Sequence, residues 1–210
     1  MGHYPEALVL ALFADLVQVG GIYRWSKEPN CMTIKSWKIL ESHHIHKNVR
    51  IDKCELPNGM IIDGFVLDYG DWATILAVTR QQEVVLIRQY RHGAQKVILE
   101  LPGGAMETEG ESLMQAARRE LLEETGYSSV TFIQIGCVSP NPANQTNQIY
   151  SFLAMDVEKV DGQHLDATED IEVVLKPLEE VIRIAKDGEL LQSMQVSTVF
   201  FALAYWNRIV

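Results

Sequence analysis

Short apolar runs separated by polar turns dominate the chain between residues 37 and 91, and this pattern predicts β-strands. The run ELPNGMIIDGFVLDY carries Asn58-Gly59 between two apolar stretches, which is a strong signal for a β-hairpin. The runs WATILAVT and VVLIRQY flank the polar turn 80–82 and predict two further strands. The next run, VILELPGG, predicts a strand that continues into a loop.

Residues 109–127, EGESLMQAARRELLEETGY, change the pattern and predict a helix. Ser112 with Gln115 three residues later fits a capping box at the start of the helix. Gly126 fits a left-handed stop at its end. Both ends of the helix are therefore marked in the sequence.

The rest of the chain predicts three strands followed by two helices. Apolar residues alternate or run without a break, as they do in core strands, in TFIQIGCV, QIYSFLAMDV and IEVVLK. Pro177 opens a helix that continues to Lys186, Gly188 stops it, and residues 193–206 form the last helix. Many strands with one helix in the middle and two near the end predict an α+β fold, with a mixed sheet between helices.

The segment 6–23, EALVLALFADLVQVGGIY, is the only stretch that suggests a membrane or an export signal. No Lys or Arg precedes the apolar run, and Asp15 and Gln18 interrupt it before it reaches the length needed to span a bilayer. We therefore predict an amphipathic helix that ends near Gly20-Gly21, and no membrane partner.

Composition narrows the classes of partner and compartment. The chain has 210 residues, 47% of them apolar, which is enough for a sizeable core. Its net charge of −10 disfavours nonspecific nucleic-acid binding, which needs a basic surface. The three cysteines, Cys31, Cys54 and Cys137, are odd in number and far apart, so neither a disulfide framework nor a zinc site is indicated. A reducing cytoplasm is the expected compartment.

The run RELLEETG crowds three carboxylates onto one arc of the predicted helix. At about 100° per residue, Glu120 and Glu124 point within roughly 40° of each other, and Glu123 lies about 60° from Glu120 on the other side. A solvated acidic face would place these acids opposite the apolar residues, but Glu120 and Glu124 share their arc with Ala116 and Ala117. Inward carboxylates are costly unless they are paired or bind metal, so we expect a cation among them, and magnesium is our first choice.

This segment resembles the Nudix box, G-x5-E-x7-R-E-U-x-E-E-x-G-U, where U is an aliphatic residue. The residues that match the family spacing are Glu111, Arg119, Glu120, Leu121, Glu123, Glu124 and Gly126. Two positions depart from the pattern. Tyr127 replaces the final aliphatic residue, and Gly104 lies one residue too far from Glu111, with Ala105 in the expected register. Either the loop is one residue longer or alanine replaces the glycine.

The resemblance implies a metal-dependent pyrophosphohydrolase. It makes Glu120 and Glu124 the principal ligands of Mg²⁺, with Mn²⁺ as an alternative, and Glu123 a further ligand or a base. It places Arg119 among the catalytic residues. The implied reaction is hydrolysis of a nucleoside diphosphate linked to another group.

Further roles around the box follow from the same resemblance. Glu111 supports the loop by pairing with Arg119. A loop carbonyl, from Gly103 or Gly104, also binds metal, and Gly104 is our choice.

Segments outside the box resemble the ADP-ribose pyrophosphatase subgroup. In IRQYRHG, Arg91 matches a substrate-contact arginine and Arg88 is a second candidate, although on a regular strand the two point to opposite faces. In SPNPANQTNQ, Pro142 stands where the subgroup carries the proline of a Ser-Pro-Gly motif, and Asn144 and Asn147 are candidates for binding sugar hydroxyls.

The acidic segment 166–173, DATEDIEV, resembles the subgroup's loop that brings a base to the attacking water. Glu169 is the first choice for this base, with Asp170 and Glu172 as alternates.

The resemblance also implies an architecture, which is an α/β/α sandwich preceded by a small antiparallel sheet that exchanges between two subunits of a homodimer. The corresponding division is an N-terminal extension over 1–32, a dimerising β subdomain over 33–80 and a hydrolase domain over 81–210. Three alternatives stay open on the sequence: a UDP- or GDP-linked sugar as substrate, a dinucleotide as substrate, and a non-catalytic module that senses such nucleotides.

Overall fold

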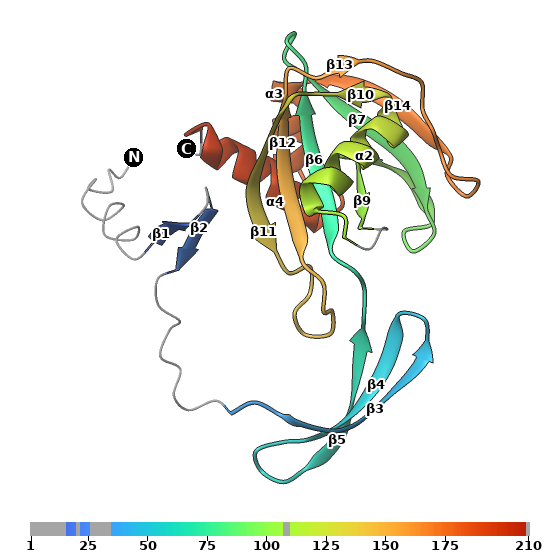
Figure 1. Cartoon of the computed structure of the whole chain (residues 1–210), viewed down its shortest axis with the longest axis vertical. Helices are drawn as coiled ribbons and strands as arrows, with labels where there is room; N and C mark the ends of the chain where they lie inside the picture. Colours follow the sequence, from blue (N-terminus) through green and yellow to red (C-terminus); the bar gives the residue numbers. More distant parts are fainter. Residues whose placement is uncertain (1–15, 20–21, 26–34, 107–109, 209–210) are drawn as a thin grey trace. The chain divides into compact units, whose positions relative to one another are not determined.

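The computed structural model describes residues 16–19, 22–25, 35–106 and 110–208, which form two compact units (Figure 1). One unit comprises the described residues within 1–42 and 52–64, and the other comprises those within 43–51 and 65–210. Among the residues that the structure describes, no helix combines the length and apolar character needed to cross a membrane.

The segment expected to be helical over 6–23 contains two strands where it is described. β1 (Leu16–Val19) and β2 (Ile22–Trp25) pair antiparallel, and residues 6–15 lie outside the described part of the chain. The prediction of a helix that ends near Gly20-Gly21 is therefore wrong for 16–19. The runs LVQV and IYRW are rich in β-branched and aromatic residues and flank Gly-Gly, which is a hairpin signal that a helical reading of the apolar positions overlooks.

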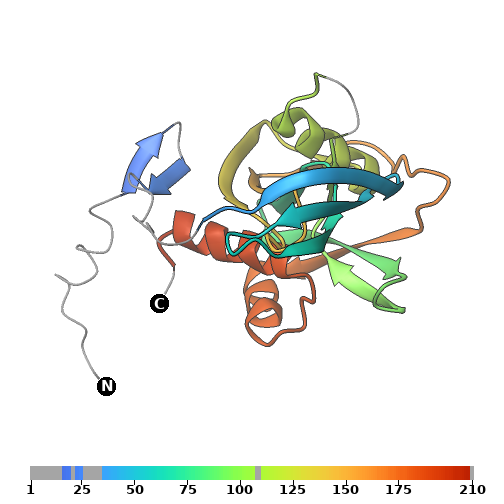
Figure 2. The ribbon, with the colours of Figure 1, turned by 90° about the horizontal axis from the view of Figure 1, so that it is seen from below.

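A three-stranded antiparallel sheet follows, with the order β3 (Lys38–His46), β4 (Val49–Glu55) and β5 (Ile61–Leu67) (Figure 2). The hairpin predicted at Asn58-Gly59 is confirmed as the β4–β5 turn. Gly59 adopts φ 83°, and its amide donates to the Leu56 carbonyl at 2.9 Å. Glycine is favoured there because a Cβ disfavours positive φ.

The larger unit is built on a seven-stranded mixed sheet. Its main order is β11-β12-β6-β7-β14, in which only the β12–β6 pair is parallel, and β8 and β9 attach to β7 and β6. A short pair of strands, β10 (Tyr127–Ser128) and β13 (Glu158–Lys159), lies outside this sheet. The strands of the large sheet are β6 (Trp72–Val78), β7 (Glu83–Arg91), β8 (Lys96–Glu100), β9 (Gly103–Ala105), β11 (Thr131–Val138), β12 (Ile149–Met155) and β14 (Ile171–Pro177).

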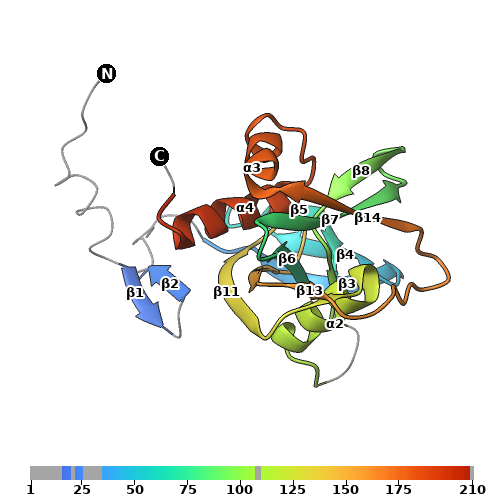
Figure 3. The same cartoon turned by 90° about the horizontal axis from the view of Figure 1, so that it is seen from above.

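Helices cover both faces of this sheet, which confirms the predicted sandwich (Figure 3). On one face, α2 (Leu113–Thr125) packs Ala117 and Leu121 against buried residues of β6 and β12. On the other face, α3 (Leu178–Lys186) and α4 (Ser193–Tyr205) cover a second apolar cluster. The two clusters are distinct because alternate side chains of each strand point to opposite faces of the sheet.

Two neighbouring strands diverge near the middle of the sheet, and the chain segment 96–105 occupies the opening. β6 and β7 pair only through Ala77–Val85 and Val78–Val84. Beyond that point β8 pairs with β7, β9 pairs with β6, and the Pro102 carbonyl between them accepts from the Ile75 amide at 3.0 Å. This insertion brings β9 next to α2.

β6 lies inside the range 33–80, which the sequence assigned to the N-terminal subdomain. In the structure it forms part of the same sheet as the strands beyond residue 81. The domain boundaries themselves stay a prediction.

Candidate active site

The acidic helix α2 turns two of its three clustered carboxylates inward. Glu120 is 7% exposed and Glu124 is 4% exposed, whereas Glu123 is partly exposed. Both predicted caps are present, because Ser112 and Gln115 form a capping box and Gly126 is left-handed at φ 74°. Glu120 and Glu124 therefore do not belong to a solvated acidic face, because the carboxylates of such a face would be exposed to water.

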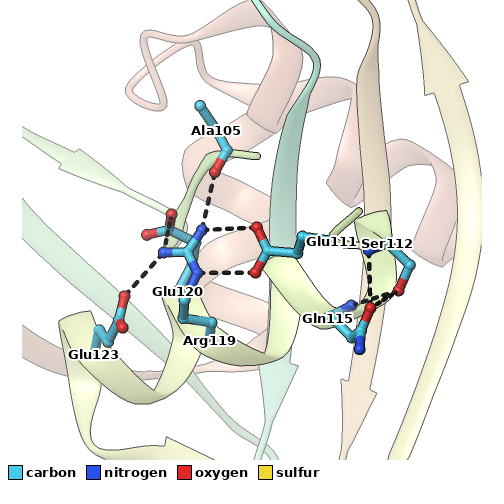
Figure 4. A network of polar contacts seen from close by, with 7 residues as sticks. All are labelled: Ala105, Glu111, Ser112, Gln115, Arg119, Glu120 and Glu123. Atoms are coloured by element: carbon cyan, nitrogen blue, oxygen red, sulfur yellow. Dashed lines mark hydrogen bonds and ion pairs between the residues drawn. The ribbon is translucent and has the colours of Figure 1, made fainter. Parts of the chain in front are cut away.

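Arg119 supplies a cation among these acids (Figure 4). Its Nη1 donates to Glu120 Oε1 and Glu123 Oε2 at 2.9 Å each, and its Nε donates to Glu111 Oε1 at 3.0 Å. Nη2 donates to the Ala105 carbonyl at 3.0 Å. Burial alone would lower the pKa of Arg119, but these carboxylates outweigh burial and raise it above its ordinary value.

Glu124 is not among the carboxylates that Arg119 contacts. Its Oε2 accepts from the Gly103 amide at 2.8 Å. Burial, assisted by the nearby charges of Glu120 and Glu169, raises the pKa of Glu124 from 4.5 to about 8. The negative charge on this side chain is therefore poorly compensated by the protein itself.

The loop that faces α2 depends on glycine at two positions. A Cβ on Gly104 would lie 2.2 Å from Glu120 Oε1, and a Cβ on Gly103 would lie 2.2 Å from the Ala73 carbonyl oxygen. Gly104, and not Ala105, is thus the residue that lies against the helix carboxylate. This arrangement favours the longer loop over replacement of the glycine by alanine.

A cavity of about 240 Å³ brings several of these groups together. Of the candidates from the sequence, Arg91 and Glu169 line it beside the α2 carboxylates, and Arg88, Asp170 and Glu172 do not. Its lining residues are Trp72, Gln89, Arg91, Gly103, Gly104, Ala105, Arg119, Glu120, Glu123, Glu124, His164, Asp166 and Glu169.

A larger cavity of about 820 Å³ shares Trp72, Arg91 and Ala105 with the carboxylate cavity. Asn147 lines it and is buried, and its Oδ1 has no hydrogen-bond partner within the described part of the chain. Pro142 and Asn144 do not line either cavity. An acidic cavity thus opens beside a roomier one that has more apolar walls.

Arg88 and Glu172 lie elsewhere on the sheet. Arg88 Nη1 donates to Glu172 Oε2 at 3.1 Å, and both line a separate cavity with Asp170. The strand geometry explains the separation from Arg91, because side chains three residues apart point to opposite faces.

The residues present fit a divalent cation. Glu120 and Glu124 are inward carboxylates that line one cavity, the lack of a Cβ on Gly104 lets the loop backbone lie close to the Glu120 carboxylate, and hard oxygen donors suit magnesium or manganese. Among the described residues, no three acidic, histidine or cysteine side chains already gather at ligand spacing. Arg119 instead holds one oxygen of Glu120 and one of Glu123.

We predict that the metal-free protein loses stability as the pH rises from about 5 to about 8. Because the pKa of Glu124 is raised from 4.5 to about 8, the folded state keeps a proton that the unfolded chain releases in this window. The contribution is fully present below pH 4.5 and is lost as the pH rises through 8, with a size on the order of 5 kcal/mol. Urea unfolding in EDTA across this range measures it.

Glu124→Gln is the matched control for this pH dependence, because a neutral amide replaces the titrating group. The difference in unfolding free energy between the original protein and the variant should grow in favour of the variant from pH 5 to pH 8. A constant difference would contradict the assignment. Added magnesium should reduce the difference at pH 8, since a bound cation favours the ionised carboxylate.

Several lining residues were not expected from the sequence. His164 and Gln89 join the carboxylate cavity, and Gln192 and Met194 join the larger one. The residues around them in the sequence form no motif that would predict a place in a cavity. Trp72 lines both cavities.

Glu100 could have been singled out from the sequence. It is a single charge inside the apolar run VILEL, and the structure buries it completely.

Comparison with known proteins gives a family match over most of this unit. A family model described as the NUDIX domain matches residues 70–194. A solved structure titled "Crystal structure of ADP compounds hydrolase" is similar with a TM-score of 0.73 and 22% identity, and the alignment covers 84% of this chain and 99% of that one. At this identity the likeness supports the fold.

Three of the similar curated proteins carry three different names. The ADP-ribose pyrophosphatase of Bacillus subtilis (strain 168) is 28% identical, over 67% of this chain and 76% of that protein. The GDP-mannose pyrophosphatase of Citrobacter koseri is 31% identical, over 75% of this chain and 86% of that protein. The methanol dehydrogenase activator of Bacillus methanolicus is 27% identical, over 80% of this chain and 89% of that protein.

Proposed function

The chain belongs to the NUDIX domain family, and we propose that it is a divalent-metal-dependent pyrophosphohydrolase of nucleotide sugars. ADP-ribose is the leading substrate, and the products are a nucleoside monophosphate and a sugar phosphate. The observation that carries this proposal is the pair of buried carboxylates, Glu120 and Glu124, in a cavity that adjoins a larger one at Arg91. The acidic cavity suits metal and diphosphate, and the larger cavity has room for a flanking nucleoside or sugar.

Four groups would hold the metal under this proposal, namely Glu120, Glu124, Glu123 and the carbonyl of Gly104. The family uses divalent cations, and Mg²⁺ is the ion that we propose, with Mn²⁺ as an alternative. When bound, such an ion supplies an activated water and neutralises charge on the phosphates. Arg119 and Glu111 hold the loop against the helix through their ion pair at 3.0 Å.

The remaining side chains of the cavity serve the diphosphate and the water. Arg91 binds a phosphate oxygen, and Glu169 accepts the proton of the attacking water. Glu169 is supported over Asp170 and Glu172 because it lines the carboxylate cavity and they do not. Its Oε2 accepts from the Asp166 amide at 3.0 Å, which holds the side chain on its loop.

GDP-mannose is the second candidate substrate. Several relatives that carry the name GDP-mannose pyrophosphatase match the chain at 29% to 31% identity. ADP-ribose and GDP-mannose share the diphosphate that the carboxylate cavity would bind, so they differ only in the groups that flank it.

A substrate panel with magnesium separates these possibilities. We expect rapid cleavage of ADP-ribose and slower cleavage of GDP-mannose, UDP-glucose and dinucleotides. Preference for GDP-mannose would replace the leading substrate. Tight binding without any product would instead favour a sensing module.

Hydrolysis in ¹⁸O-labelled water locates the attacked phosphorus. Label in the nucleoside monophosphate means attack at the nucleoside-side phosphorus, which is the result expected with Glu169 as base. Label in the sugar phosphate would contradict the geometry proposed for Glu169.

The homodimer and the cytoplasmic location also stay proposals. Apolar side chains on β3 and β5 are exposed, among them Ile39, Ile45, Ile61 and Phe65, and burial against a second copy would remove them from water. Sedimentation equilibrium tests the dimer.

A further inference from the structure

A fully buried carboxylate lies behind Arg91 and has no part in the metal site. Glu100 is 0% exposed and is the last residue of β8. Arg91 Nε donates to Glu100 Oε1 at 2.9 Å, and Arg91 Nη2 donates to Glu100 Oε2 at 2.7 Å. This two-pronged pairing fixes the plane of the guanidinium as well as its position.

The pairing leaves one nitrogen of Arg91 for a ligand. Nε and Nη2 are both used by Glu100, whereas Nη1 has no partner in the described part of the chain. The guanidinium lines both cavities, and its charge acts on Glu124 and Glu169. Arg91 is thus fixed by Glu100 where it borders both cavities, and Nη1 is left for a ligand.

The side chain of Gln192 completes the support of Glu100. Gln192 occupies the N-cap position of α4 and makes no capping hydrogen bond there. Its Nε2 donates instead to Glu100 Oε1, the oxygen that also accepts from Arg91 Nε. Ser, Thr, Asp or Asn usually caps a helix, so a glutamine that leaves the helix uncapped and binds a buried carboxylate points to a use outside the helix.

A neighbouring glutamine fixes the same strand end through its backbone. Gln195 Oε1 accepts from the Leu101 amide at 3.1 Å, and its Nε2 donates to the Leu101 carbonyl at 3.4 Å. The start of α4 therefore holds the end of β8 at two successive residues. Two residues farther along, the Gly103 amide contacts Glu124, so this strand end lies between both halves of the site.

We propose that Glu100 and Gln192 are positioning residues that hold Arg91 in place to bind the substrate's diphosphate. This inference rests on the proposed function only in naming the ligand as a diphosphate. Glu100 is fully buried and does not touch substrate. Gln192 also borders the larger cavity, but its effect on the diphosphate acts through Glu100 and Arg91. The last helix, whose sequence has no catalytic motif, thereby contributes to affinity for substrate.

The test replaces Gln192 by methionine, which keeps length and packing but removes the hydrogen bond to Glu100. The measured quantity is the affinity for α,β-methylene-ADP with magnesium, determined by equilibrium dialysis, because this probe cannot be cleaved at its bridging carbon. We expect roughly tenfold weaker binding, since a hydrogen bond to a charged group is lost. For ADP-ribose hydrolysis, KM should rise by a similar factor while kcat changes little.

A double-mutant cycle with Arg91→Ala separates positioning from a general structural effect. In the Arg91→Ala background, Gln192→Met should cause no further loss of affinity, because the group that it positions is gone. Gln81→Met, in the exposed turn before β7, is the matched control and should bind the probe as the original protein does.

Three results would overturn the inference: unchanged affinity in Gln192→Met, an equal further loss in the Arg91→Ala background, or no binding of the probe by the original protein. Failure of the proposed function looks different. A protein that binds α,β-methylene-ADP through Arg91, and binds it more weakly in Gln192→Met, but cleaves no nucleotide would refute the proposed enzyme and leave the positioning in place.

Discussion

Replacement of Glu124 or Glu120 by glutamine is expected to lower kcat for nucleotide-sugar hydrolysis at least roughly a hundredfold. Mutation of residues that merely support metal ligands lowers metal affinity or activity about 10- to 100-fold. Loss of a direct ligand should therefore lower kcat at least as much. Both side chains are buried in the carboxylate cavity, and an amide cannot supply the negative oxygen that a divalent cation needs. Steady-state kinetics with ADP-ribose and magnesium measures the loss.

The fold should survive both substitutions, which separates lost chemistry from lost structure. Glutamine keeps the volume of glutamate, and at position 124 it removes a charge that burial disfavours. Unfolding in EDTA at pH 8 should therefore show Glu124→Gln at least as stable as the original protein. Glu158→Gln, an exposed residue paired with Arg80 at 3.4 Å, is the control and should keep full activity. Near-normal turnover of Glu124→Gln would defeat the metal assignment.

The local features of the fold could be predicted from the sequence because short-range rules govern them. The Asn58-Gly59 turn and the caps of α2 each depend on a few neighbouring residues. The inward direction of Glu120 and Glu124 follows from helical periodicity alone, and their burial confirms it.

Features that depend on distant contacts could not be predicted in the same way. Glu100 and Gln192 meet across 92 positions, and no local pattern announces that pairing. Arg119 pairs with Glu111, and its further bonds to Glu120 and Glu123 add contacts that the sequence did not predict. The N-terminal strands were misread because the apolar positions of 6–23 fit a helix, while Gly-Gly and the β-branched residues after position 15 favoured a hairpin.

Arg119→Met is expected to lower the free energy of unfolding by about 3–5 kcal/mol, the usual cost of breaking a buried ion pair from one side. Arg119 contacts three carboxylates, and two of their side chains, those of Glu111 and Glu120, are only 10% exposed. Methionine fills much of the same space but leaves these charges unpaired. Urea unfolding of the metal-free protein at pH 7.5 measures the loss.

A second substitution and a matched variant distinguish lost charge compensation from lost packing. If unpaired carboxylates cause the loss, adding Glu120→Gln to Arg119→Met should restore part of the stability, because one buried charge without a partner is removed. Arg183→Met is the control, because Arg183 also bridges two acids, Asp187 at 2.8 Å and Glu189 at 2.9 Å, but on the exposed side of α3. Exposed ion pairs contribute little to stability, so that variant should be nearly as stable as the original protein. Equal losses in Arg119→Met and Arg183→Met, or no recovery when Glu120→Gln is added to Arg119→Met, would contradict the compensation of buried charge by Arg119.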